Sequence, residues 1–385
     1  MPLAVQFLFS MKSSIKIIVA ALLMVLGWSV FRKPSTPISQ ASTTEVSSNA
    51  SQPEIPATPV AVVAPPPQNT PRTAPASPSQ PTNMLARIIQ GDAPDLTSEQ
   101  LEPFLQANHR DADSLLTAFR ATHNRELLEE AIANYPNDPR VAFTAWFRAQ
   151  PGQNDPKGLV AEREALDKFT QVAPDNSLAN YLSAANYFKT GHPDLAVQEM
   201  QAGAGKSKYN DYVQDAILSM QEAYQTAGYS EAEAKLAATT GALLPHLAGL
   251  KQAGIGLIEV ANNYSQAGDA ASAQSAMQMC LDLGQRLNDS NSMTLIQQLV
   301  GVALERKAYD AMAATTTDPA AKQEIQDRIN EIQQYRDGIK QTVSNLQIET
   351  WLQNASPEDI NAYIDRERIL GEQNALQWLA NRQKQ

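Results

Sequence analysis

The stretch from Met200 to Lys208, MQAGAGKSK, contains the Gly-Lys-Ser of a phosphate-binding loop. Such a loop reads Gly-x-x-x-x-Gly-Lys-Ser/Thr and connects a strand to a helix, so that backbone N–H groups and the lysine surround a phosphate. Here Met200 occupies the first glycine position, and the preceding segment DLAVQEMQA has a helical pattern. We therefore expect Gly203 and Gly205 to mark a helix end and Lys206 to be solvated.

Other reactive residue types also lack the spacing that chemistry requires. The histidines His109, His123, His192 and His246 include no pair four residues apart, the spacing that binds zinc from one helix face. Cys280 is the one cysteine and lies in an apolar helical pattern, where a small buried side chain is expected. We predict no metal, no cofactor and no catalytic residue. Carboxylates brought together from distant helices would leave no local signature.

Composition separates a proline-rich amino-terminal part from an acidic remainder. Of the 24 prolines in the 385 residues, 12 lie in residues 34–83, which contain no aromatic residue. This segment cannot bury enough apolar surface to offset its chain entropy, and we predict a disordered linker. The overall charge is −11 and the first 83 residues contribute +3, so the rest carries −14. An acidic domain repels a phosphate backbone, so we expect no binding to nucleic acid.

Residues 17–31, IIVAALLMVLGWSVF, form an uncharged apolar run with basic residues on both sides. As a helix this run spans about 22 Å, shorter than the roughly 30 Å hydrocarbon core of a bilayer. Lysine side chains that reach the interface extend it slightly. We predict that residues 1–33 are a signal anchor, a single helix that holds the protein in a membrane. A cleaved signal peptide is the alternative.

Translation from Met11 would give the short basic region and apolar run of an export signal. Two basic residues on each side of the run leave the positive-inside rule without a preference. The polar linker and the acidic domain favour translocation, so we place the folded domain outside the cytoplasm, in a bacterial periplasm. Secretion after signal cleavage and a cytoplasmic domain on an anchor are the alternatives.

From residue 84 onward the apolar pattern is helical, and one five-residue pattern occurs twice. The pattern A-x2-Y-x3-G-x4-A-x3-M is formed by Ala184, Tyr187, Gly191, Ala196 and Met200, and again by Ala261, Tyr264, Gly268, Ala273 and Met277; Tyr224 and Gly228 repeat its aromatic–glycine pair. Each glycine is predicted to end a helix in the left-handed conformation.

This pattern resembles the tetratricopeptide repeat, a helix–turn–helix unit of about 34 residues. Pro136 and Pro174 match the prolines that close such units, whereas Gln221 replaces the small residue ahead of Tyr224. The resemblance covers residues 112–287 and the units are degenerate. It implies an all-α fold in which helical hairpins stack as a solenoid.

We assign residues 84–310 to the repeats and residues 311–385 to further carboxyl-terminal helices. Heptad positions are occupied by Ile325, Ile329, Ile332, Ile339, Val343 and Leu346. This spacing is typical of either a short coiled coil, through which the chain would self-associate, or a long helix packed on the repeats, which we prefer. Trp351, Trp378 and Leu379 are predicted to belong to a helical pair that caps the array.

These features together predict a membrane-tethered scaffold that binds a protein or peptide partner, and not an enzyme. The resemblance implies a concave groove lined by the first helix of each hairpin. Its candidate residues are Tyr181, Phe188, Lys189, Glu222, Gln225, Asn262 and Gln266. Asn262 matches a position where such repeats hold a peptide backbone.

An enzyme with an active site in a helical solenoid or barrel is one alternative, and a self-assembling structural component of the cell envelope is another. A groove lined by apolar and amide groups favours binding, and a closed pocket with clustered Asp and Glu favours an enzyme.

Overall fold

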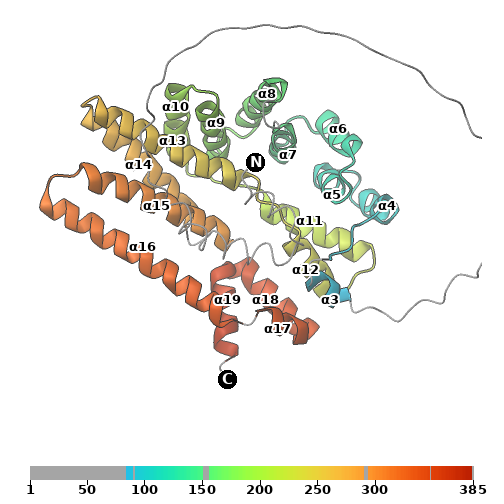
Figure 1. Ribbon diagram of the computed structural model, residues 1–385. Helices are drawn as coiled ribbons and strands as arrows, with labels where there is room; N and C mark the ends of the chain where they lie inside the picture. The colour runs from blue at the N-terminus through green and yellow to red at the C-terminus, as the bar shows by residue number, and fades with distance from the viewer. Residues whose placement is uncertain (1–83, 90–91, 151–155, 290–293, 347, 384–385) are drawn as a thin grey trace, which may run out of the picture.

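The computed structural model describes residues 84–89, 92–150, 156–289, 294–346 and 348–383 (Figure 1). Their regular structure consists of helices α3 to α19 with no strand among them, which confirms the all-α prediction. The predicted anchor and linker, residues 1–83, lie outside these residues. Within the described part, every helix is too short or too polar to cross a membrane.

The helices, in chain order, are α3 (Met84–Ile89), α4 (Ser98–Ala107), α5 (Ala112–Thr122), α6 (Arg125–Asn134), α7 (Pro139–Ala149), α8 (Pro156–Val172), α9 (Ser177–Lys189), α10 (Pro193–Ala204), α11 (Val213–Thr226), α12 (Glu231–Thr240), α13 (His246–Gln266), α14 (Ala270–Leu287), α15 (Leu295–Thr315), α16 (Pro319–Asn345), α17 (Ile348–Asn354), α18 (Pro357–Leu370) and α19 (Glu372–Arg382). Side-chain caps define several of their starts. Thr97 and Ser230 form capping boxes at α4 and α12, and Ser356 caps α18 ahead of a first-turn proline.

The three aromatic–glycine pairs end α9, α11 and α13 in the same way. Gly191, Gly228 and Gly268 have φ angles of 79°, 94° and 80°, as predicted. After each glycine, the next residue donates its N–H to the carbonyl of the tyrosine, at 2.9, 3.1 and 2.9 Å. This is the hydrogen bond of a Schellman motif. The left-handed backbone, which strains any residue with a Cβ, explains the glycine at all three ends.

Consecutive helices pair into hairpins: α5 with α6, α7 with α8, α9 with α10, α11 with α12, and α13 with α14. The alanines of the repeated pattern lie inside two of these pairs. Ala184 and Ala196 are fully buried between α9 and α10, and Ala261 and Ala273 are at most 2% exposed between α13 and α14. Side chains of this size let paired helices approach closely.

The hairpins do not follow one another in space in strict chain order. Helix α9 packs directly against α13, and α10 against α14. The hairpin between them in sequence lies elsewhere, with α11 against α4 and α5, and α12 against α3 and α18. In Figure 1, α4 to α10 follow one another along one side of the molecule, while α11 and α13 to α16 cross beneath them. The buried apolar residues accordingly form two large clusters. One contains residues of α9, α10, α13 and α14, and the other contains residues of α4, α5, α11 and α12.

Helix α16 lies along α15 and carries the heptad residues. Ile329, Ile332 and Ile339 are all less than 9% exposed. Ile339 packs in a cluster with Leu299 of α15 and Leu379 of α19. The heptad stripe is therefore covered by the chain itself, as expected for a long helix packed on the array.

Helices α14 and α15 meet backbone to backbone at Gly284 and Gly301. A Cβ built on Gly301 would lie 2.5 Å from the carbonyl oxygen of Gly284 and 2.7 Å from the backbone nitrogen of Asn288. Across the same interface, Asn288 Nδ2 donates to Glu305 Oε1 at 3.0 Å. Burial in this interface raises the pKa of the Cys280 thiol to about 12, consistent with its predicted role as a small core side chain.

We predict that Gly301→Ala lowers the free energy of unfolding by about 1–3 kcal/mol, because the new methyl group forces α14 and α15 apart. Gly338→Ala, at an exposed position of α16 with no atom within 4 Å of the added Cβ, is the matched control. It should raise the stability by about 0.5–1 kcal/mol. Urea unfolding followed by circular dichroism measures both, and equal effects of the two variants would contradict this account of the interface.

Candidate functional site

Besides Tyr181 of α9, which is described below, four of the predicted groove residues lie on the neighbouring helices α9 and α13. The Phe188 ring packs on Gly256, where an added Cβ would lie 2.6 Å from the ring. Lys189 Nζ lies 3.1 Å from Glu162 Oε2, and the lysine side chain is 45% exposed. Asn262 and Gln266 are exposed near the end of α13. Three of these four side chains are therefore accessible to a partner.

The two predicted residues on α11 lie in a different group of helices, in which α11 packs against α4 and α5. Glu222 accepts a hydrogen bond from Asn108 Nδ2 of the α4 end at 3.1 Å, and Gln225 is exposed. Helix α9 packs against α13, whereas α11 packs against α4 and α5. The residues of the predicted groove therefore lie in two separate groups of helices.

The buried position of Tyr181 depends on Gly203, which lies just before the Gly-Lys-Ser residues. Tyr181 is 1% exposed, so its ring is out of reach of a partner, and an added Cβ on Gly203 would lie 2.6 Å from that ring. Lys206 donates to Asn180 Oδ1, and its carbonyl accepts from Arg286 Nη1 at 2.5 Å. The segment ends α10, as predicted. Lys206 is partly buried and hydrogen-bonded, which corrects the expectation of a solvated lysine.

A buried histidine–aspartate contact joins α13 to the segment before α11. His246 is fully buried, and its Nε2 lies 3.3 Å from Asp211 Oδ2. Burial disfavours the charged form of Asp211, but the contact with His246 and backbone hydrogen bonds from Val213 and Asp211 together hold the pKa of Asp211 below its ordinary value. The Phe143 ring lies 6.1 Å from the imidazole. We assign this pair a structural role at the start of α13.

A hollow of about 790 Å³ lies between the end of α16, α17 and the end of α19. Its described lining consists of amide and hydroxyl side chains with one aromatic ring: Gln341, Thr342, Asn345, Thr350, Trp351, Asn354, Ala380 and Gln383. Its volume is within the usual range for ligand sites, roughly 300–1,000 Å³. Each amide can both donate and accept hydrogen bonds, so this wall suits a polar, uncharged ligand surface.

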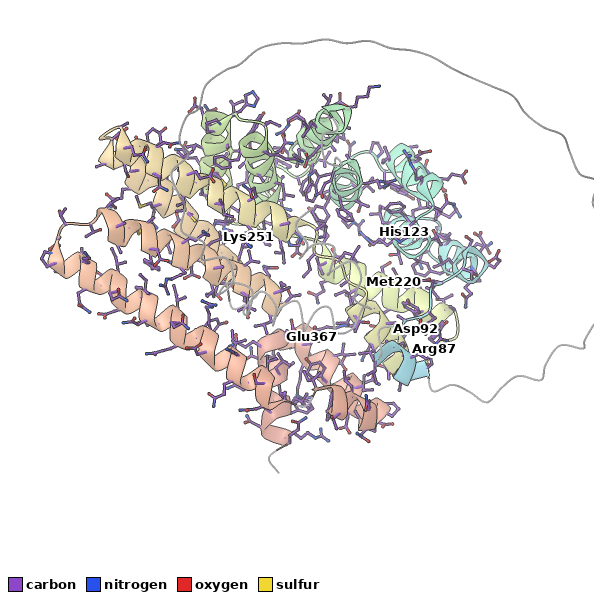
Figure 2. All side chains as sticks on the ribbon, in the orientation of Figure 1. Arg87, Asp92, His123, Met220, Lys251 and Glu367 are labelled. Atoms are coloured by element: carbon purple, nitrogen blue, oxygen red, sulfur yellow. The ribbon has the colours of Figure 1, made fainter. Side chains whose placement is uncertain are left out.

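Trp351 also borders a second cavity, of about 100 Å³, which contains two carboxylates. The lining comes from α3, α11, α12, α17, α18 and α19 and is mainly aliphatic. The polar groups among the lining residues are Glu367, Glu372, Thr239, Thr240, Thr294, Tyr363 and the Trp351 indole. Glu367 is labelled in Figure 2. We call this space the carboxylate cavity.

Two contacts fix the helices around the carboxylate cavity. Glu372 is 8% exposed, and its Oε2 accepts the backbone N–H of Leu295 at 2.7 Å, which satisfies a free donor at the start of α15. Lys235 of α12 is 5% exposed, and its Nζ lies 2.7 Å from Asp365 Oδ1 of α18. These contacts hold α19 against α15 and α18 against α12.

The two carboxylates perturb each other. Burial, and then the charge of Glu372, raise the pKa of Glu367 to about 8, while Arg368 acts in the opposite direction. Burial also raises the pKa of Glu372, and the hydrogen bond from Leu295 opposes that shift. Near pH 7 the pair therefore holds a proton. Such a pair can transfer a proton to a ligand or give up its proton to bind a cation.

The site residues Trp351, Glu367 and Glu372 were not predicted from the sequence as a group. Trp351 was assigned to a capping element, and both glutamates lie in ordinary helical patterns. They meet because α17 packs against α3, and α18 packs against α12 and α19, while Glu372 at the start of α19 accepts the first N–H of α15. No local motif encodes these contacts.

No protein-family model, curated protein or solved structure matches the chain. The functional assignment therefore depends on the geometry of the hollow and the cavity.

We predict that stability falls as pH rises from about 5 to 8. In this window the unfolded Glu367 carboxyl is ionised, whereas the folded one keeps its proton until about pH 8, so the folded state binds more protons. At about 1.4 kcal/mol per pKa unit, the loss amounts to roughly 2–4 kcal/mol. Glu367→Gln should remove this part of the pH dependence, because the amide resembles the protonated acid.

Urea unfolding at a series of pH values measures the effect. Glu324→Gln, at an exposed position of α16, controls for the loss of one negative charge. A pH dependence that is the same in Glu367→Gln and in the unaltered protein would refute the buried-acid interpretation.

Proposed function

We propose that this protein is a membrane-tethered helical-repeat scaffold that binds a protein or peptide partner, and that the hollow around Trp351 is part of its binding surface. The observation that carries this proposal is the amide-rich lining of the hollow. An extended polypeptide presents N–H and C=O groups along its length, and side-chain amides such as those of Gln341 and Asn354 complement both.

Trp351 supplies the apolar anchor that such a surface needs. Tryptophan is among the residues that contribute most to binding energy at protein interfaces. Its ring lies 5.6 Å from that of Tyr363, which restricts its orientation before any partner arrives. Trp378 packs against the same hydrophobic cluster as Trp351, and Arg366 lies 4.1 Å from the centre of the Trp378 ring. A side chain already fixed in place loses less entropy on binding.

The exposed ends of α9 and α13 provide a second contact area in this proposal. Asn262, Gln266 and Lys189 lie there, as the tetratricopeptide resemblance implies. The matching helix ends at Gly191 and Gly268 support a common origin of these two hairpins. Stacking of hairpins into a solenoid remains part of the proposal.

The tether in this proposal is the apolar run of residues 17–31, followed by the linker of residues 34–83. A polyproline II chain of this length, about 50 residues, would reach at most roughly 150 Å. The acidic folded domain could then search for a partner at a distance from the membrane while its local concentration there stays high.

The carboxylate cavity meets one condition of the enzyme alternative, because it contains two acidic groups with raised pKa values. A catalytic site also needs donors or cations aimed at the charge that develops during reaction. The described lining supplies hydroxyl groups and aliphatic side chains. We therefore keep binding as the proposed function and treat the carboxylates as groups that recognise a ligand.

We expect site-specific photo-crosslinking in the native membrane to identify one polypeptide partner at the hollow. A photoreactive amino acid at Asn354 should crosslink this partner, and Trp351→Ala in the same chain should reduce the yield at least tenfold. The same amino acid at Val160, which is 59% exposed on α8, is the control position. Equal yields from Asn354 and Val160, or no effect of Trp351→Ala, would count against the hollow as the binding surface.

We also predict that the folded domain is on the non-cytoplasmic side of the membrane. Protease added to cells with a permeabilised outer membrane should then remove residues 84–385 while a cytoplasmic control protein stays intact. Protection of the domain until the inner membrane is dissolved would place it in the cytoplasm instead.

A further inference from the structure

We propose that the carboxylate cavity binds a primary ammonium group carried on a short apolar stem. This site is distinct from the hollow between α16, α17 and α19, which we call the amide hollow, and it does not depend on the proposed partner binding. Three features carry the inference: hydrogen-bond acceptors without donors, an apolar wall, and aromatic rings at the edge.

The cavity contains more hydrogen-bond acceptor oxygens than there are protein donors bonded to them. The Leu295 N–H engages Oε2 of Glu372, and no further hydrogen bond reaches this carboxylate or that of Glu367 from the described residues. Thr239 Oγ1 is completely buried in the lining and has no hydrogen-bond partner there. An ammonium group has three donors and no acceptor, and it matches this set of oxygens.

The nearest guanidinium group does not fulfil this role. Arg368 follows Glu367 in α18, yet its Nε and Nη2 atoms are buried without a hydrogen-bond partner in the described structure. Arg368 is not among the residues that line the cavity. Its charge therefore acts on Glu367 from behind the wall, and the cavity itself contains no cationic side chain.

The rest of the wall suits a hydrocarbon stem. Leu236 of α12, Ile217 of α11 and Ile364 of α18 contribute aliphatic surface. The Trp351 and Tyr363 rings also line the cavity, and aromatic faces attract a cation. One water occupies about 10–15 Å³ of such space, so about 100 Å³ has room for a ligand of a few non-hydrogen atoms.

A divalent metal ion fits this cavity less well than an organic cation. Calcium takes six to eight oxygen ligands and magnesium six, most of them from carboxylates, carbonyls and water. The described residues contain no group of three or more His, Cys, Asp or Glu side chains arranged to hold a metal. The aliphatic wall cannot replace the missing oxygens, whereas it gains by covering an alkyl stem.

Binding of the ammonium group requires Glu367 to lose its proton. The titratable groups that act on Glu367 are Glu372 of α19 and Arg368 of α18. Burial first, and then the two carboxylates, raise the pKa of the neighbouring Tyr363. Proton release should therefore accompany binding below about pH 8, and the affinity should rise between pH 6 and pH 8. A neutral ligand would release no proton.

The test is isothermal titration calorimetry of the full folded chain at pH 7.5 with n-pentylamine and with 1-pentanol, which has the same shape without the charge. We expect pentylamine to bind at least tenfold more tightly, with a heat that varies with the ionisation enthalpy of the buffer. N-acetyl-lysine methylamide, with its norleucine analogue as control, tests whether the ammonium of a polypeptide side chain enters as well as that of a free amine.

Glu367→Gln keeps the shape of the side chain and should reduce pentylamine affinity at least tenfold. Glu358→Gln, exposed near the start of the same helix, should leave it unchanged. Thermal unfolding confirms that each variant is folded. If Glu367→Gln does not fold, Thr239→Val, which should also reduce pentylamine affinity, is the second test. Pentylamine that binds no more tightly than pentanol, or equally well to Glu367→Gln, overturns the proposal. Neither result would alter crosslinking at Asn354, so the two proposals fail independently.

Discussion

Gly249 and Gly256 give α13 a surface without side chains, and α9 lies directly on it. Leu182 and Phe188 of α9 occupy the space that Cβ atoms on these glycines would need. This contact joins the first and third hairpins of the repeated pattern, so the hairpin between them in sequence has to lie elsewhere. Helices α11 and α12 then contact α3, α4, α5 and α18, which brings the carboxyl-terminal helix α18 against α12.

Local features were predictable from the sequence because they depend on neighbouring residues. A tyrosine four residues before a glycine predicted the left-handed ends at Gly191, Gly228 and Gly268, and the buried Ala184 and Ala261 followed from the same pattern. The order of the hairpins in space was not predictable in this way. It depends on contacts between α9 and α13, about 70 residues apart, and on the size of the side chains that meet there.

The candidate site shows the same limit. Asn262 and Gln266 are exposed near the end of α13, whereas Tyr181, three residues before a pattern alanine, faces the core because Gly203 leaves room for its ring. Glu372 could not be distinguished from a solvated glutamate, since its burial depends on a donor at Leu295, 77 residues away. It stabilises the start of α15 and also borders the cavity, so in our proposal a single carboxylate has both a structural and a recognition role.

Trp351 is part of the wall of both the amide hollow and the carboxylate cavity. A ligand that shifts its indole ring in one space changes the shape of the other. The two occupancies are then thermodynamically linked, and the linkage is reciprocal: whatever factor a small cation contributes to the affinity for a polypeptide, the polypeptide contributes to the affinity for the cation. A helix of seven residues, α17, would in this way make the scaffold responsive to the chemical composition of its surroundings.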